Sequence, residues 1–350
     1  MTTSVLVVDD SALMRRALRT ILTGPGPAWN GEFEVHTARN GADALDQLGR
    51  LRPDVITLDL TMPVMDGLSC LAEIMARQPT PVVVVSSLAE RYTQVTVEAL
   101  ELGAVDYVVK PGGTASANLE EVAGELVTKV RAASCAHLRR TASGRTPKMP
   151  SPIRGTAPPG GVDLLLIGCS TGGPRLLSEL LPQLPASLGA PVVVAQHIPA
   201  AFTGPLARRL DELCALRVHE VNRSMAVRRG HIYLGRGSAD VVVARRTDGL
   251  IVKTVPSGAD YSWHPSVSRL VATARRHCDP ARLVCALLTG MGDDGAAEMT
   301  AVHRAGGRTI AESEETAAIW GMPGALARRG GASVVLPSYA IASRLADWVR

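Results

Sequence analysis

The sequence predicts two α/β domains, each with a mainly parallel, doubly wound sheet. Short apolar runs alternate with stretches of helical spacing in both halves of the chain, which is typical of such sheets. A length of 350 residues is too great for one ordinary hydrophobic core and sufficient for two. A segment rich in Pro and Gly separates the halves and predicts domains at 1–133 and 162–350, joined by a linker at 134–161.

Apolar runs in residues 1–133 predict the five strands of a (βα)5 domain. The runs are VLVVDD, FEVHTA, DVITLD, PVVVVSS and AVDYVVKP. Helical spacing follows them near 11–24, 40–50, 66–77, 91–102 and 118–136. Because the runs are apolar on both faces, we expect a buried parallel sheet with helices on either side.

The linker and the two domains differ in charge. Residues 134–161 contain five prolines, four glycines, five basic residues and no acidic residue. Residues 1–133 carry 11 Lys and Arg against 17 Asp and Glu, a net charge of −6, whereas 162–350 carry 21 against 16, a net charge of +5. This division suggests the hypothesis that the two domains attract each other electrostatically and that the attraction helps to hold them in a closed arrangement.

A second α/β pattern fills residues 162–350. The runs VDLLLIG, PVVVAQH, RLVCALLT and RTIAE predict core strands of a parallel sheet. The closely spaced runs HIYLG, DVVVARR and LIVKTV predict an antiparallel patch with a hairpin at the sheet edge. Helices are expected near 174–183, 202–214, 265–277, 295–305 and 338–349.

Composition excludes several classes of protein. No apolar run approaches the roughly 18 residues that cross a bilayer, so we expect no membrane insertion. Aromatic residues make up 3% of the chain and no dense basic stripe occurs, which argues against nucleic acid as a partner and against a transcriptional regulator. The six cysteines show no CxxC spacing, which favours reduced thiols and a cytoplasmic location.

Reactive side chains follow the predicted strands of the first domain at the edge where chemistry gathers in α/β sheets. They are Asp9 and Asp10, then Asp59, then Ser86 and Ser87, and finally Lys110. Three converging carboxylates repel one another unless a hard cation lies among them, and Mg²⁺ prefers such oxygen ligands. Asp59 is then placed to attack a phosphoryl group, with the cation and Lys110 neutralising the developing charge.

The motifs VVDDS, LDLTMPVMDG, VVVVSS and VDYVVKP resemble those of response-regulator receiver domains. The resemblance implies that Asp59 accepts a phosphoryl group from a histidine kinase. It also implies that Asp9, Asp10, Asp59 and the backbone carbonyl of Thr61 hold Mg²⁺. Ser86 is the expected switch hydroxyl, and Ser87 remains the alternative because the strand end can shift by one residue.

Three segments of the second domain place a reactive group in a turn of small residues after an apolar strand. These are LLLIGCSTGGP with Ser170, VVVAQHIP with His197, and CALLTGMGDDG with Asp293 and Asp294. Acyl transfer requires a nucleophile, a histidine that takes its proton and a carboxylate that orients the imidazole. The sequence alone leaves open a phosphate-binding turn at GCSTGG, Cys169 as the nucleophile, and Asp294 as a cap of the helix that follows it.

The segments IGCSTGG, VAQHIP, GHIYLG, HPSV, LLTGMGDDG, AESEETAAIWGMP and GALARRGGA resemble the catalytic domain of chemotaxis protein-glutamate methylesterases of the CheB type. A receiver, a linker and this domain form the whole architecture of that family. The resemblance implies Ser170 as nucleophile, His197 as general base and Asp294 as orienting acid. Asp294 alone precedes the glycine of the T-G-M-G-x-D-G pattern, and Asp293 occupies the variable position.

The same resemblance implies that Thr171 and the backbone of Met291 serve as oxyanion and positioning groups. It implies hydrolysis of glutamate methyl esters and deamidation of glutamines on the cytoplasmic domains of chemoreceptors, with no cofactor in the catalytic domain. Phosphorylation of Asp59 is expected to uncover a face that the unphosphorylated receiver closes. The alternative is a second domain that binds partners without catalysis.

Overall fold

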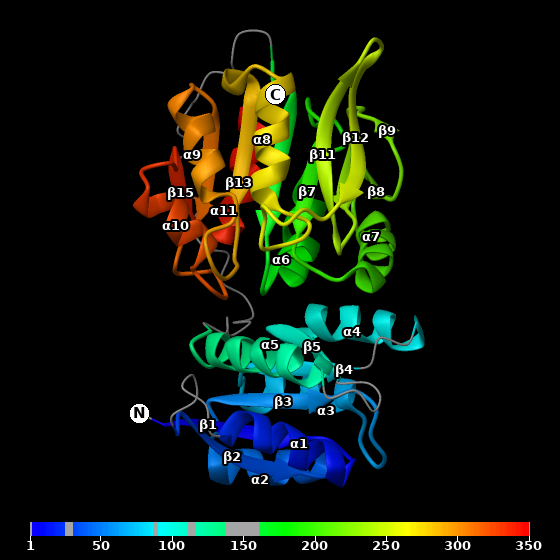
Figure 1. Ribbon diagram of the computed structural model, residues 1–350, viewed down its shortest axis with the longest axis vertical. Coiled ribbons are helices and arrows are strands. Elements are labelled where there is room, and N and C mark those ends of the chain that lie inside the picture. The colour runs from blue at the N-terminus through cyan, green and yellow to red at the C-terminus, as the bar shows by residue number, and fades with distance from the viewer. Residues whose placement is uncertain (1, 25–30, 87–89, 111–116, 137–160, 350) are drawn as a thin grey trace. The chain divides into compact units, whose positions relative to one another are not determined.

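The computed structural model describes residues 2–24, 31–86, 90–110, 117–136 and 161–349. They belong to two units, Met1–Arg140 and Thr141–Arg350 (Figure 1). The division falls inside the predicted linker, of which residues 137–160 lie outside the described part of the chain. Among the described residues, no helix has the length and apolarity to cross a membrane.

The first unit contains a five-stranded parallel sheet in the order β2-β1-β3-β4-β5. Its strands are β1 (Thr3–Val8), β2 (Phe33–Ala38), β3 (Val55–Asp59), β4 (Val82–Ser86) and β5 (Asp106–Val109). Its helices are α1 (Ala12–Thr23), α2 (Gly41–Leu51), α3 (Gly67–Arg77), α4 (Glu90–Leu102) and α5 (Ala117–Ser134). The predicted (βα)5 architecture is confirmed. The strand order reverses between β1 and β3, and in α/β sheets ligands bind at the carboxyl ends of the strands at such a point.

The second unit is built, in its described residues, on a seven-stranded parallel sheet in the order β15-β14-β13-β6-β7-β10-β8. Its strands are β6 (Leu164–Cys169), β7 (Val192–Gln196), β8 (Arg217–Val221), β10 (His231–Gly235), β13 (Leu283–Leu287), β14 (Arg308–Glu312) and β15 (Val334–Leu336). Its α-helices are α6 (Gly173–Leu180), α7 (Ala200–Leu213), α8 (Val267–His277), α9 (Ala296–Arg304), α10 (Met322–Arg328) and α11 (Ser338–Trp348). The predicted doubly wound α/β class is confirmed.

A small antiparallel sheet accompanies the parallel one and corrects one prediction. Its order is β11-β12-β9, with β9 (Met225–Ala226), β11 (Ala239–Arg246) and β12 (Gly249–Pro256). The hairpin of β11 and β12 is as predicted, but the assignment of HIYLG to this patch is wrong. That segment is β10, which pairs in parallel with β7 and β8. Although β10 lies close to the hairpin in sequence, four of its five residues are buried. Pairing within the main sheet provides that burial.

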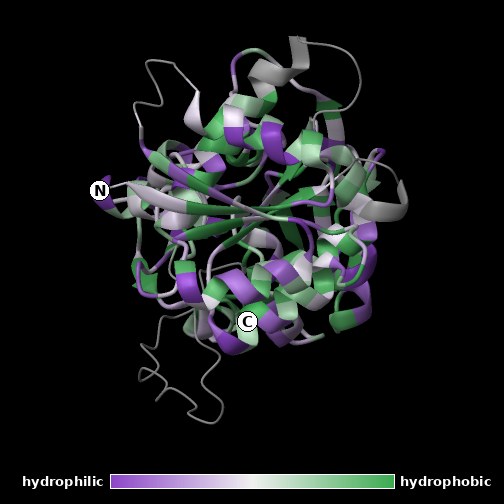
Figure 2. Ribbon diagram, turned by 90° about the horizontal axis from the view of Figure 1, so that it is seen from below, coloured by the Kyte–Doolittle hydropathy of each residue, from purple (hydrophilic) through white to green (hydrophobic). Residues whose placement is uncertain are grey.

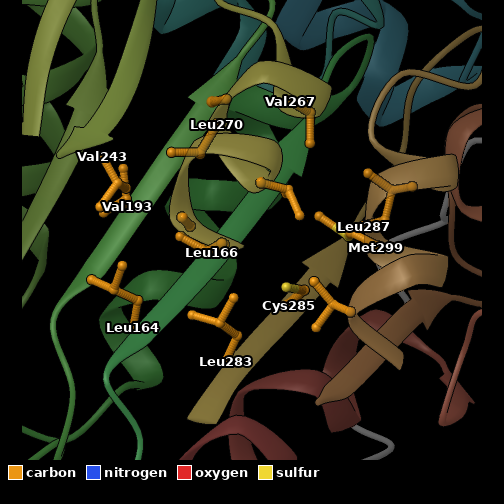
Figure 3. Packing of buried hydrophobic residues seen from close by; sticks show 14 of the residues in the cluster. Leu164, Leu166, Val193, Val243, Val267, Leu270, Leu283, Cys285, Leu287 and Met299 are labelled. Carbon is orange, nitrogen blue, oxygen red and sulfur yellow. The ribbon is translucent and has the colours of Figure 1, made fainter. Parts of the chain in front are cut away.

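The core of the second unit joins both sheets through α8. Leu166 and Val193 of the parallel sheet, Val243 of the hairpin and Leu270 of α8 belong to one buried cluster (Figure 3). Burial of such side chains supplies the main driving force for folding, about 25 cal/mol per Å² of apolar surface. Hydrophobic residues predominate in the central strands of the molecule, whereas the helices around them carry both apolar and polar residues (Figure 2). This packing fixes the strand ends that carry the candidate site.

Candidate active site

Three neighbouring strands of the second unit place the predicted catalytic residues at one edge of the sheet. Strands β13, β6 and β7 are adjacent, and Ser170 and His197 directly follow β6 and β7. The Ser170 N–H donates to the Thr289 carbonyl at 2.9 Å, and the His197 N–H donates to the Cys169 carbonyl at 3.0 Å. The turns after all three strands are therefore joined by backbone hydrogen bonds.

The turn that carries Ser170 depends on glycines for close packing. Gly172 has a φ of +77°, a conformation that glycine adopts without strain. A Cβ at Gly290 would lie 2.7 Å from the Ser170 Cβ, so the loop after β13 can approach the serine only without a side chain. Helix α6 begins at Gly173, with Pro174 in its first turn, and directs its positive end toward the residues after β6.

His197 and Asp294 form a hydrogen-bonded pair with little exposure to solvent. The His197 Nε2 lies 2.9 Å from the Asp294 Oδ2, and the two side chains are 7% and 8% exposed. A neutral imidazole donates through one nitrogen and accepts through the other. Because Nε2 faces the carboxylate, Nδ1 is the nitrogen left to accept a proton.

Asp294 is held by the N-terminus of a helix that precedes it in the chain. Its carboxylate accepts hydrogen bonds from the Val267 N–H at 2.7 Å, the Ser268 N–H at 2.9 Å and the Ser266 Oγ at 3.2 Å. These groups open α8, whose positive end favours a carboxylate. The alternative in which Asp294 caps the helix after it is wrong, since the residue before α9 is Gly295 and makes no side-chain cap.

These contacts keep Asp294 ionised. Burial by itself raises the pKa of this carboxyl group, but its hydrogen bond with His197, the charge of His197 and hydrogen bonds from Ser268 outweigh burial. The pKa falls from 3.8 to about 2. The residue is therefore a carboxylate wherever the imidazole can act as a base.

The lowered pKa of Asp294 predicts a loss of stability in acid. Its ionised form stabilises the fold above pH 3.8, and this contribution disappears as the pH falls toward 2. The loss should be about 2 kcal/mol of unfolding free energy. We expect urea unfolding to show this dependence between pH 5 and 2.5 in the wild type and a shallower one in Asp294→Asn. Equal pH dependence in the two proteins would contradict the assignment.

Trp263 is a residue of the site that the sequence analysis missed. Its ring stacks on that of His197, with centroids 5.6 Å apart and an interplanar angle of 10°. The indole covers part of the imidazole and is itself 46% exposed. It also borders the loop after β13, since a Cβ at Gly292 would lie 4.0 Å from its Nε1. Its position directly before the HPSV segment was the only signal in the sequence.

The remaining predicted residues surround this centre. Thr171 is buried, and its carbonyl accepts a hydrogen bond from the Thr289 Oγ1 at 2.9 Å. Within the described part of the chain, the Met291 N–H donates to no backbone carbonyl. Asp293 points elsewhere, because its carboxylate is 66% exposed and contacts Arg329.

Cys169 does not have the properties of a nucleophile. Its side chain is fully buried, and burial first, then the charge of Glu312, raises the pKa of its thiol. A reactive cysteine needs an accessible thiolate. The structure therefore disfavours the thiol as a rival to the Ser170 hydroxyl.

The first unit brings its predicted residues together at the carboxyl ends of β1, β3 and β5. Lys110 Nζ lies 2.9 Å from the Asp9 Oδ2 and 2.6 Å from the Asp59 Oδ2. Asp9, Asp10 and Asp59 each offer one oxygen, and these oxygens lie within 4.8 Å of one another. The Thr61 N–H donates to the Asp59 Oδ1 at 3.3 Å, which places Thr61 beside the same carboxylate.

This donor set fits Mg²⁺. All the side-chain ligands are oxygens, and the carboxylates of Asp9 and Asp59 are buried beside the ammonium group of Lys110. Burial raises the pKa of Asp59 despite the neighbouring Lys110, and the charge of Asp9 adds to that effect. A divalent cation would offset the cost of burying these charged carboxylates and would reduce the repulsion between them.

Ser86 is the predicted switch serine. Ser86 ends β4 and is buried, and its Oγ accepts a hydrogen bond from the Thr96 Oγ1 of α4 at 3.2 Å. Ser87, the alternative, lies outside the described residues. The choice between them remains a prediction.

Fold and site together define a class of two-unit α/β protein. The first unit clusters aspartates at the carboxyl ends of β1 and β3. In the second unit a serine, a histidine and an aspartate follow the neighbouring strands β6, β7 and β13. The family model of the response regulator receiver domain matches residues 5–121, and that of the CheB methylesterase matches residues 165–345. The chain belongs to the CheB methylesterase family and carries a receiver domain, as its motifs predicted.

Relatives match over nearly the whole chain. The protein-glutamate methylesterase/protein-glutamine glutaminase 3 of Rhodospirillum rubrum is 50% identical over 99% of this chain and 96% of its own. The protein-glutamate methylesterase/protein-glutamine glutaminase of Archaeoglobus fulgidus is 42% identical over 97% of this chain and 96% of its own. The crystal structure of the Thermotoga maritima CheB methylesterase catalytic domain, 34% identical, covers 53% of this chain and 98% of that domain with a TM-score of 0.51.

Proposed function

We propose that this protein is a phosphorylation-regulated protein-glutamate methylesterase and protein-glutamine glutaminase. Its relatives carry these names over their full length. The observation that supports the activity most directly is the His197–Asp294 hydrogen bond at a strand end adjacent to that of Ser170. Glutamate methyl esters and glutamine amides are both γ-acyl derivatives, so one acyl-transfer site can serve both reactions.

In the first proposed step, the Ser170 Oγ attacks the side-chain carbonyl carbon of the substrate while its proton passes to the His197 Nδ1. Asp294 stabilises the resulting imidazolium, and the Met291 N–H, with Thr171, faces the oxyanion. The imidazolium then protonates the leaving group. Methanol departs from the ester, or ammonia from the amide, and a glutamyl ester on Ser170 remains.

In the second step, water hydrolyses this acyl-enzyme. His197 accepts a proton from the attacking water and returns it to the Ser170 Oγ as the acyl–oxygen bond breaks. A glutamate carboxylate is released. Apart from the attacking water, these steps use only side chains and backbone groups of the chain.

The receiver is proposed to control this activity through Asp59. A carboxylate oxygen of Asp59 attacks the phosphoryl group of a histidine kinase, and the phosphohistidine bond breaks. Asp9, Asp10, Asp59 and the carbonyl of Thr61 would hold Mg²⁺, which neutralises phosphoryl oxygens when bound. Lys110 contacts the same oxygens, and the hydroxyl of Ser86 closes onto the phosphate as the switch.

The cellular setting is proposed from the family. The substrates are the cytoplasmic domains of methyl-accepting chemoreceptors, and the phosphodonor is a histidine kinase of the chemotaxis type, which places the protein in the cytoplasm. The unphosphorylated receiver restricts access to Ser170, and phosphorylation shifts the equilibrium toward an open state. If moderate salt leaves the basal rate of ester hydrolysis unchanged, attraction between the charged domains does not contribute to that restriction.

Methanol release from methylated receptor membranes tests both halves of the proposal. Wild-type protein should release methanol, and a small phosphodonor such as acetyl phosphate should increase the rate. Ammonia release from receptors with unprocessed glutamines tests the second reaction. Failure of the wild type to release methanol from any methylated receptor would contradict the proposed function.

Replacement of Asp59 by Asn should abolish stimulation. The amide cannot accept the phosphoryl group, so the ratio of rates with and without acetyl phosphate should fall to about one. Asp46→Asn is a suitable control, because Asp46 is an exposed aspartate of α2 in the same domain. Stimulation that survives in Asp59→Asn would show that another residue accepts the phosphoryl group.

A further inference from the structure

The side chain of Gln196 connects the two turns that carry Ser170 and His197. Gln196 is the last residue of β7 and is 1% exposed. Its Nε2 donates to the carbonyl of Ser170 at 2.9 Å and to the carbonyl of His197 at 2.9 Å. One amide group therefore uses both of its N–H bonds to join the candidate nucleophile to the candidate base.

The place of this contact in the sheet gives it a role. The pairing of β6 with β7 ends with Cys169 opposite Gln196, and the last backbone bond runs from the His197 N–H to the Cys169 carbonyl. Ser170 and His197 each follow the last paired residue of their strand, so the hydrogen bonds between β6 and β7 no longer set the distance between them. The Gln196 amide continues the connection for one more residue on each strand.

The orientation of the amide is determined by chemistry. A flipped amide would bring its oxygen against two carbonyl oxygens, which is repulsive, so the NH₂ group must face them. The Oε1 then lies buried without a hydrogen bond from the described residues. It packs at Gly173, where a Cβ would overlap it. Burying an amide oxygen without a hydrogen bond costs free energy of folding. The two hydrogen bonds of the NH₂ group are what offset this cost.

We propose that Gln196 is a positioning residue that fixes the distance between Ser170 and His197, an inference that rests on the proposed function. Proton transfer from a serine requires an imidazole nitrogen within about 2.6–3.2 Å. A misplacement of about 1 Å lowers the rate about 10²-fold. Gln196 touches no reacting atom and acts through the two backbone carbonyls.

Two variants separate positioning from folding. Gln196→Met keeps the length of the side chain and removes both donors. Gln196→Glu keeps the shape and lacks a donor when ionised, but a protonated carboxyl group can donate to one carbonyl. Gln183→Met is the matched control, since the Gln183 Nε2 donates to the Glu179 carbonyl at an exposed position.

The measurements are kcat and KM for methanol release, the melting temperature, and the rate at which phenylmethanesulfonyl fluoride labels Ser170. For Gln196→Met we expect kcat to fall about 30- to 100-fold and labelling to slow at least about tenfold. We expect KM to stay within about threefold of the wild type, because substrate binding does not involve Gln196, and Gln183→Met to match the wild type in all measurements.

The pH dependence of Gln196→Glu gives a readout that a purely structural role would not produce. Burial opposite two carbonyls should raise the pKa of the introduced carboxyl group. Its activity relative to the wild type should therefore increase as the pH falls from 8 to 5.5, because protonation restores one donor. If the methionine variant fails to fold, this profile decides the question.

The inference is overturned if folded Gln196→Met keeps kcat and labelling within threefold of the wild type. It is equally overturned if Gln196→Glu retains a constant fraction of wild-type activity across that pH range. The labelling of Ser170 does not depend on the natural substrate. A wild type that is labelled but releases no methanol would therefore contradict the proposed substrate and leave the positioning test intact.

Discussion

Replacement of Ser170 by alanine is expected to lower the rate of methyl ester hydrolysis by at least about 10⁴-fold, because no acyl-enzyme can form. The fold should survive. The Ser170 N–H donates to Thr289, and the Ser170 carbonyl accepts from Gly173 and Gln196. These are backbone groups of residue 170, and alanine retains them.

Cys169→Ala is the appropriate control for this variant, because it alters the neighbouring side chain and tests the rival nucleophile. The thiol is buried and protonated, so most of the activity should remain. Methanol release gives the rates, and mass spectrometry of quenched reactions detects a glutamyl adduct in the wild type and its loss in Ser170→Ala. Substantial methanol release by Ser170→Ala would refute the serine mechanism.

Replacement of Asp294 by asparagine should reduce kcat by about 10³- to 10⁴-fold with little change in KM. The carboxylate orients the imidazole through Nε2 and stabilises the charge that develops on it. Asparagine is neutral, and its NH₂ group cannot accept the hydrogen bonds that the N-terminus of α8 donates to the carboxylate. The imidazole would lose its stabilising charge and its fixed tautomer.

The adjacent Asp293→Asn variant controls for the loss of one negative charge in the same loop. Asp293 is 66% exposed and pairs with Arg329 at 3.1 Å, so its replacement should change kcat by no more than about twofold. Steady-state methanol release measures both variants. Equal losses in the two proteins would indicate an effect of net charge, and full activity of Asp294→Asn would remove Asp294 from the mechanism.

Most strands of the fold could be predicted because buried parallel strands appear in the sequence as continuous apolar runs. Runs such as LLLIG and VVVA contain no polar side chain, and the structure buries every residue of β6 and β7. Edge strands are less apolar, so their pattern in the sequence is weaker. No apolar run predicted β8 or β15, which are only partly buried, and the pairing predicted for β10 was wrong because packing sets its partners.

The motifs and apolar runs were sufficient to predict the family and the strands at or after whose carboxyl ends Ser170, His197, Asp294 and Asp59 lie. How these residues are held became visible only in the folded chain. The N-terminus of α8 holds Asp294, Trp263 stacks on His197, and the amide of Gln196 binds the carbonyl of Ser170. The physical reason is separation along the chain. His197 and Asp294 are 97 positions apart and Asp294 and Val267 are 27 apart, and local spacing encodes no distance between such residues.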